Sequence, residues 1–315
     1  MNFNNGLDQG AITKMATIVT KSAFDDPAKL HQIYDQIPHA LKDAVPQSTA
    51  TDDRRKIFVL RHGERVDLVF GKFVPYSFDE AGTYTRKDLN MPKSFPARRD
   101  FKQWDFDSPL TNIGLFQAKL IGESMKDAGE KINFAFCSPF FRCIQTCDET
   151  LRAMGLRDTV KICIEPGLME FGQFYVDSLP EFYTPDELVE IGFNIDTNYE
   201  PLTTMEQLKL CVDETFTEYY QRNANVTTRI IENYYGNALI SAHGTNLDMN
   251  TRLACGLEMR TTSEMSSVMM NVGFCALLAI AEDKNGKWAI TETPLSQITH
   301  AKNARFDYRI FIDTD

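Results

Sequence analysis

Short apolar runs alternate along most of the chain with longer segments that carry apolar residues at helical spacing. The runs "KIFVL" at 56–60, "NFAFCS" at 133–138, "VKICIE" at 160–165 and "NALISAH" at 237–243 are predicted to be strands. Several of the longer segments repeat apolar residues at three- and four-residue steps, which is typical of amphipathic helices. Strands that alternate with helices in this way predict an α/β fold with a mostly parallel sheet.

The sequence also marks where three of these helices begin or end. Thr111 is a predicted N-cap, and Gly155 is a predicted stop for a helix over Phe141–Met154. The segment Thr184–Leu188 reads "TPDEL" and holds a capping box with proline in the first turn. The apolar positions of the helix after Thr111 are Ile113, Phe116, Leu120, Ile121 and Met125.

Two further elements are predicted in the second half of the chain. A longer helix is expected over about 213–235, before the fourth strand. Near the carboxyl end, two apolar runs flank Asn285 and Gly286, a pair that favours a tight turn. This segment therefore predicts a β-hairpin.

The apolar pattern also divides the chain into regions. Residues 1–52 are predicted to be an amino-terminal extension, partly helical or mobile, because their helical pattern is weak and is interrupted at Pro38. A single folded domain is predicted over 53–315. Within it, residues 66–110 form a long insertion rich in aromatic side chains, which we expect to shape a substrate pocket.

Composition and charge exclude several classes of partner. The 315 residues carry a formal net charge of −11, and nucleic acids and anionic membranes both call for a basic surface. There is no apolar run of about 18 residues and no signal-like amino end, so a cytoplasmic location is expected. The seven cysteines lack CxxC spacing, which fits free thiols in a reducing compartment.

Charged residues stand where the predicted strands end. Arg61 and His62 follow the first strand, Arg142 lies shortly after the second, and His243 ends the fourth. The carboxyl ends of parallel strands meet at one edge of a sheet, where ligands bind in open α/β folds. We therefore expect these side chains to converge there, although they are far apart in the sequence.

The converging residue types suit phosphoryl transfer. A phosphoryl group carries close to two negative charges, and guanidinium groups such as those of Arg61, Arg65 and Arg142 match its oxygens. Neighbouring cations lower the pKa of a histidine, so His62 is expected to be a neutral imidazole that can attack phosphorus. Cysteine-dependent phosphatases place arginine six positions after the nucleophile. Here Cys137, Cys147 and Cys255 each precede an arginine by five positions, which excludes that mechanism.

Four motifs carry a family resemblance. They are "LRHGER" at 60–65, "CSPFFRCIQT" at 137–146, "EPGLMEF" at 165–171 and "SAHG" at 241–244. In type, order and spacing they resemble the histidine phosphatase, or phosphoglycerate-mutase-like, superfamily. "RHGERVDLVFGK" and "LNMP" add a closer resemblance to the phosphatase domain of suppressor-of-T-cell-receptor-signalling proteins and to insect ecdysteroid-phosphate phosphatases. The resemblance implies a three-layer α/β/α fold with a mostly parallel central sheet.

The resemblance also implies roles for individual residues. His62 aligns with the nucleophile, while Arg61, Arg142 and His243 align with residues that hold the phosphoryl oxygens. Arg65 is implied as an additional phosphate ligand.

Two glutamates receive more specific expectations. Glu170 aligns with the family's general acid, and the neighbouring Met169 and Phe171 are expected to raise its pKa enough for it to carry a proton. Glu64 is expected to brace the arginines through ion pairs.

The function predicted from these features is a metal-independent phosphomonoesterase without a cofactor. It would act through a phosphohistidine on tyrosine phosphate or on bulky esters such as steroid phosphates. A phosphate-binding signalling scaffold with little turnover is the main alternative. Phosphoglycerate mutases differ at the positions of Arg65 and Leu68, and the acid phosphatase and phytase branch differs at Asp67 and Gly244. The resemblance further implies a possible homodimer.

Overall fold

The computed structural model describes residues 54–175, 179–293 and 308–312. The predicted extension over 1–52 lies outside the described residues. The domain boundaries given above therefore stay predictions.

A six-stranded mixed sheet forms the centre of the described part of the chain, with the strand order β3-β2-β4-β1-β5-β6. Strands β3, β2, β4 and β1 are parallel neighbours, whereas β5 runs antiparallel to β1 and to β6. The four predicted strands and the hairpin are therefore confirmed. The bounds are Lys56–Arg61 (β1), Phe134–Cys137 (β2), Ile162–Ile164 (β3), Ala238–Ala242 (β4), Leu277–Glu282 (β5) and Trp288–Thr291 (β6).

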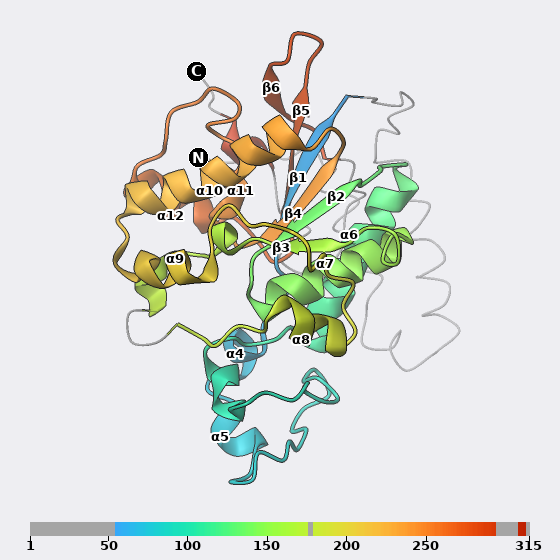
Figure 1. Ribbon diagram of the computed structural model, residues 1–315, viewed down its shortest axis with the longest axis vertical. Coiled ribbons are helices and arrows are strands. Elements are labelled where there is room, and N and C mark those ends of the chain that lie inside the picture. The colour runs from blue at the N-terminus through green and yellow to red at the C-terminus, as the bar shows by residue number, and fades with distance from the viewer. Residues whose placement is uncertain (1–53, 176–178, 294–307, 313–315) are drawn as a thin grey trace, which may run out of the picture. The chain divides into compact units, whose positions relative to one another are not determined.

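Both faces of this sheet are covered by helices. Successive residues of a strand point to opposite faces, so Phe58 and Leu60 of β1 join one apolar cluster while Ile57 and Val59 join another. Helices α6 and α7 cover the first face, and α10 to α12 lie on the second (Figure 1). This confirms the three-layer α/β/α fold. The bounds are Asn112–Asp127 (α6), Phe141–Met154 (α7), Phe216–Asn233 (α10), Asn246–Met249 (α11) and Thr262–Met269 (α12).

The predicted helix signals occur at the predicted positions. The Thr111 hydroxyl accepts a hydrogen bond from the Gly114 N–H at 2.9 Å and so caps α6. Gly155 ends α7 with φ of 76°, a left-handed conformation that favours glycine. Thr184 forms the capping box of a short helix, α8 (Pro185–Glu190). These local signals are read correctly because each depends on only a few neighbouring residues.

The predicted buried face of α6 is partly wrong. Ile113 and Phe116 are 38% and 51% exposed, and the helix instead buries several small residues. A Cβ atom at Gly122 would lie 2.3 Å from the Thr150 carbonyl oxygen of α7, so the two helices approach more closely than larger side chains allow. Apolar periodicity misidentified this face because close packing here depends on glycine and alanine. The buried residues of α6 are Gly114, Gln117, Ala118, Ile121, Gly122, Ser124 and Met125.

The insertion over 66–110 lies beyond the end of β1 in Figure 1 and has its own aromatic cluster. It contains α4 (Val66–Phe70), α5 (Val74–Ser77) and the 3₁₀ helix η1 (Phe101–Asp105). A cavity of about 470 Å³ opens on this cluster. It is lined by none of the six predicted site residues, which are Arg61, His62, Arg65, Arg142, Glu170 and His243. That the insertion shapes the substrate pocket stays a prediction. The aromatic residues whose rings contact one another are Phe73, Phe78, Tyr84, Phe95, Phe101 and Trp104.

Short helical segments complete the described elements. The remaining bounds are Pro166–Leu168 (η2), Gly172–Tyr175 (η3), Met205–Lys209 (α9), Leu210–Asp213 (η4) and Tyr308–Phe311 (η6).

No helix among the described residues is long and apolar enough to cross a membrane.

Candidate active site

The turn after β1 brings His62 to the carboxyl edge of the sheet. Its backbone N–H donates to the Ala242 carbonyl of β4 at 2.9 Å, and Gly63 follows directly. A Cβ atom at Gly63 would lie only 2.5 Å from the Gly114 carbonyl oxygen, so this close approach to α6 requires glycine. The turn therefore holds His62 firmly, with 3% of its surface exposed.

The tautomer of His62 follows from its surroundings. Nδ1 lies 2.8 Å from the Gly63 carbonyl oxygen, which can only accept, so Nδ1 carries the proton and donates it. Burial, followed by the charges of Arg142 and Arg61, lowers the pKa of His62 well below its usual range. A neutral imidazole in this tautomer has its lone pair on Nε2, as a nucleophile requires.

Arg142 supplies a fully buried positive charge in the first turn of α7. One terminal nitrogen, Nη2, donates to the Glu170 carboxylate and lies 3.3 Å from His243 Nδ1. Nε and Nη1 are buried and have no hydrogen-bond partner in the part of the chain that the structure describes. An unsatisfied buried donor costs about 1–3 kcal/mol. Two of them on one guanidinium group indicate a binding place for an anion.

His243 follows β4 and lies beside His62. The two rings are 5.6 Å apart at an angle of 70°. His243 Nε2 lies 2.9 Å from the Ser138 hydroxyl, and Nδ1 lies 3.7 Å from a carboxylate oxygen of Glu170. Burial lowers the pKa of His243 and outweighs the opposing effect of Glu170.

The other two predicted arginines differ in their partners. Arg61 donates to the Val272 carbonyl oxygen and stacks on the Phe274 ring, while its buried Nε has no hydrogen-bond partner among the described residues. Burial lowers the pKa of Arg61 to about 10, so it stays charged near neutral pH. Arg65 instead forms a two-point ion pair with Asp67.

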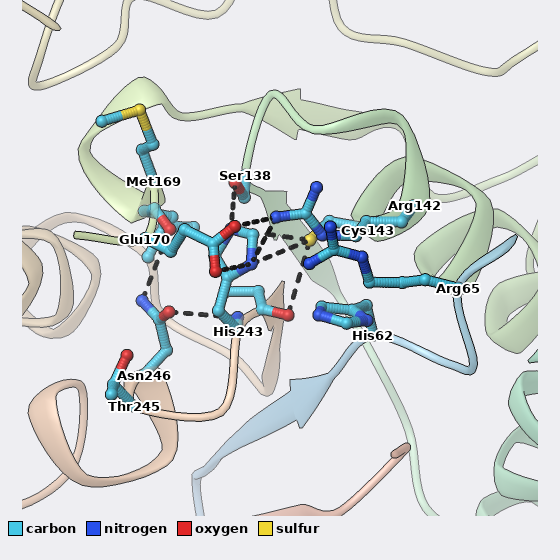
Figure 2. A network of polar contacts seen from close by, with 12 residues as sticks. His62, Arg65, Ser138, Arg142, Cys143, Met169, Glu170, His243, Thr245 and Asn246 are labelled. Atoms are coloured by element: carbon cyan, nitrogen blue, oxygen red, sulfur yellow. Dashed lines mark hydrogen bonds and ion pairs between the residues drawn. The ribbon is translucent and has the colours of Figure 1, made fainter. Parts of the chain in front are cut away.

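Glu170 completes the group, and its expected pKa is wrong. Figure 2 shows its carboxylate facing both Arg142 and His243, with the Met169 side chain pointing away. Burial alone would raise the pKa, but the charge of Arg142, followed by that of His243, outweighs it, and the pKa of Glu170 lies below its usual range. In the site without a phosphate ester, Glu170 is therefore ionised.

The expectation for Glu64 is also wrong. Its carboxylate accepts hydrogen bonds from Thr111 Oγ1 at 2.8 Å and from Asn90 Nδ2 at 3.0 Å. These contacts join the turn after β1 to the start of α6 and to the insertion. Glu64 therefore braces the backbone around the site instead of the arginines.

The sequence did not single out three residues that contact this group. Ser138 binds His243, and its position at the end of β2 was an available signal. The Asn246 side-chain oxygen accepts from the His243 N–H at 3.0 Å, while Asn246 Nδ2 contacts the Leu168 carbonyl oxygen at 3.4 Å (Figure 2). The Tyr175 hydroxyl donates to Glu170, and no sequence pattern marked it. Arg142, Glu170 and His243 are joined to these three by hydrogen bonds, and the His62 ring contacts His243. The charges of Arg61 and Arg65 act on both histidines.

Comparison with known proteins agrees with the fold. The family model "Histidine phosphatase superfamily (branch 1)" matches residues 96–292, a span that includes Arg142, Glu170 and His243 and begins after His62. The chain belongs to the histidine phosphatase superfamily. This confirms the predicted family.

Individual relatives refine the comparison. The ecdysteroid-phosphate phosphatase of Drosophila melanogaster is 39% identical over 285 residues, which cover 90% of this chain and 37% of that protein. The human ubiquitin-associated and SH3 domain-containing protein B is 35% identical over 265 residues, or 81% of this chain and 40% of that protein. The chain thus spans about two fifths of these relatives.

A solved structure is similar over the whole of its own length. The crystal structure of the ecdysone phosphate phosphatase from Bombyx mori, in complex with tungstate, superposes with a TM-score of 0.70 at 36% identity. The match covers 82% of this chain and 100% of that one.

Proposed function

We propose that the chain is a metal-independent phosphomonoesterase that acts through a phosphohistidine at His62. The observation that carries this proposal is that a nucleophile and an anion-binding group, His62 and Arg142, are buried next to each other. A neutral histidine with its lone pair on Nε2 lies beside buried arginines, and two nitrogens of Arg142, Nε and Nη1, have no hydrogen-bond partner among the described residues. The combination suits in-line attack on a dianionic phosphoryl group.

The reaction has two steps. In the first, His62 Nε2 bonds to phosphorus while the ester oxygen leaves and takes a proton from Glu170. Arg61, Arg65, Arg142 and His243 hold the remaining phosphoryl oxygens. In the second, water bonds to phosphorus, the nitrogen–phosphorus bond breaks, and the Glu170 carboxylate accepts the proton that water loses.

The proton on Glu170 must arrive with the substrate. A phosphoryl group bound at Nε and Nη1 of Arg142 offsets part of the guanidinium charge and adds negative charge next to the carboxylate. Both changes favour the protonated acid. The low pKa of Glu170 in the free site is therefore compatible with a general acid in the complex.

The substrate class that we propose is an ester of a flat or bulky apolar alcohol, such as tyrosine phosphate or a steroid phosphate. Phe274, which is partly exposed, lies 6.0 Å from the His62 ring between centroids. An aromatic ring in this place suits an apolar leaving group. The names of two relatives, an ecdysteroid-phosphate phosphatase and an ecdysone phosphate phosphatase, agree with this class.

The proposal is tested by phosphate release from four substrates: p-nitrophenyl phosphate, a phosphotyrosyl peptide, a steroid phosphate and 3-phosphoglycerate. We expect faster release from the aryl and steroid esters than from 3-phosphoglycerate, because only the former carry an apolar group that can pack against Phe274. Tungstate binding without release from any of the four would contradict the phosphatase and favour the phosphate-binding scaffold. A homodimer and a cytoplasmic location stay predictions.

Chelators are expected to leave the rate unchanged. Arginine N–H groups and histidines supply all the positive charge and the nucleophile of the proposed reaction, so no step needs a metal ion. The measurement compares p-nitrophenyl phosphate turnover before and after treatment with EDTA and gel filtration. A rate that collapses on this treatment and returns with added divalent metal would overturn the metal-free mechanism.

A further inference from the structure

Helix α7, which carries Arg142 in its first turn, is held at its start by a residue from outside the helix. Its N-cap residue, Phe140, offers no side-chain hydrogen bond. Instead the Phe141 N–H donates to Asp107 Oδ1 at 2.8 Å, and Asp107 is fully buried. A carboxylate satisfies an otherwise unpaired N–H at a helix start and is favoured there by the helix dipole.

Asp107 belongs to the insertion over 66–110, and a second residue of the insertion holds its carboxylate. Its second oxygen, Oδ2, forms an ion pair with Arg98 Nη2, and the two side chains are 1% and 4% exposed, Asp107 first. The Arg98 guanidinium carbon lies 4.0 Å from the Trp104 ring centre and 4.5 Å from that of Tyr183. Packed in this way, Arg98 has little freedom to move, and it fixes Asp107 in turn.

A third connection reaches the described residues before α8. Arg98 Nη1 donates to the Glu181 carbonyl oxygen at 3.2 Å. Asp107 and Arg98 thus join three parts of the described chain: the insertion, the start of α7, and the residues just before α8.

Arg142 depends on this arrangement because the start of α7 places both its backbone and the ring on which it stacks. Phe141, whose N–H binds Asp107, directly precedes it in the chain, and the Phe140 ring centre lies 3.9 Å from its guanidinium carbon. Among the described residues the guanidinium group makes hydrogen bonds through Nη2 alone, to Glu170, Tyr175 and His243. A small rotation of the first turn of α7 would therefore carry the unpartnered nitrogens, Nε and Nη1, away from a phosphoryl group.

We propose that Asp107 is a positioning residue for Arg142, an inference that rests on the proposed function. Its carboxylate fixes the first turn of α7 against the insertion, so that Nε and Nη1 of Arg142 point to where the phosphoryl oxygens bind. Arg98 acts with it by holding the carboxylate. Asp107 itself touches none of the six predicted site residues through a hydrogen bond or ion pair that the described residues show.

The test compares Asp107→Ala and Asp107→Asn with Asp148→Ala as a matched control. Asp148 is also a nearly buried aspartate that forms ion pairs, and it lies on α7 itself, but its partners are Arg152 and Arg157. For each protein we would measure the thermal unfolding midpoint and, well below that midpoint, the dissociation constant of tungstate. Tungstate binding needs the arginines but no turnover, so it separates positioning from chemistry.

We expect Asp107→Ala to weaken tungstate binding on the order of 10- to 100-fold, since small misplacements of a binding group have effects of this size. Asp107→Asn keeps an oxygen for the Phe141 N–H, so it should fold even if the alanine variant does not, and should weaken binding less. Asp148→Ala should leave the dissociation constant within about 2-fold, even if it lowers the unfolding midpoint.

If the unaltered protein binds tungstate and hydrolyses phosphate esters, two results would overturn the inference. One is wild-type tungstate affinity in the Asp107 variants. The other is an equal loss in Asp148→Ala, which would mark a general destabilisation of α7. Failure of the unaltered protein to bind tungstate would instead overturn the proposed function, and this inference with it.

Discussion

Replacing His62 by alanine is expected to lower turnover of every phosphate ester by a factor on the order of 10⁴ or more, a typical cost of deleting a nucleophile. The reason is chemical, because the other neutral imidazole beside Arg142, that of His243, has both ring nitrogens in contact with neighbouring side chains. His243 lies 5.6 Å away between ring centres, but its own nitrogens face Ser138, Arg142 and Glu170. The variant should also form no phosphoenzyme.

The measurement is acid-labile, base-stable labelling of the protein from a ³²P-labelled aryl phosphate, followed by denaturation. His62→Asn is the sharper companion variant, because its amide N–H is able to replace the hydrogen bond to Gly63 while no lone pair remains for attack. Both variants should keep the wild-type unfolding profile and should still bind tungstate. Turnover or labelling that survives in both would show that His62 is not the nucleophile.

The sequence was informative about this site because the fold places functional residues where strands end. Arg61, His62 and His243 directly follow or end parallel strands, and adjacent parallel strands bring such positions together whatever their separation along the chain. The pKa shift of His62 was also predictable in sign, since cations beside an imidazole and burial act in the same direction.

Other features could not be predicted because they depend on contacts between distant segments. The side chains of Met169 and Phe171 suggested an apolar setting for Glu170, yet its carboxylate meets Arg142 from α7. Asp107 carries no local signal either, because its role appears only when Arg98 and the Phe141 N–H are brought to it. The exposed face of α6 has the same cause, since its packing is decided by how closely α7 approaches.

Glu170→Gln is expected to slow the first turnover of an alkyl phosphate on the order of 10²- to 10⁴-fold, the usual contribution of general acid catalysis. The first turnover of p-nitrophenyl phosphate should slow far less, because nitrophenolate leaves without a proton. Rapid-mixing measurement of the initial burst of alcohol isolates this step from hydrolysis of the phosphohistidine, which also uses Glu170. Equal losses on both esters would remove the general-acid role.

Glu64→Gln is a suitable control, since it neutralises a carboxylate near the site that contacts Thr111 and Asn90 instead of Arg142. It should leave the ratio of the two burst rates unchanged.

The charge state of Glu170 predicts a second measurable effect of the Glu170→Gln variant, on anion binding. Arg142 and His243 hold the pKa of Glu170 below its usual range in the free site. A bound dianion engages Arg142 and repels the carboxylate, so that pKa rises and the protein takes up a proton on binding. Tungstate binding should therefore weaken as the pH rises, and calorimetry in buffers of different ionisation enthalpy should detect the proton.

Glu170→Gln should bind tungstate more tightly and without this proton uptake, because the carboxylate that repels the anion is gone. If the variant bound tungstate more weakly than the wild type, Glu170 would be a ligand of the anion instead of its competitor for Arg142.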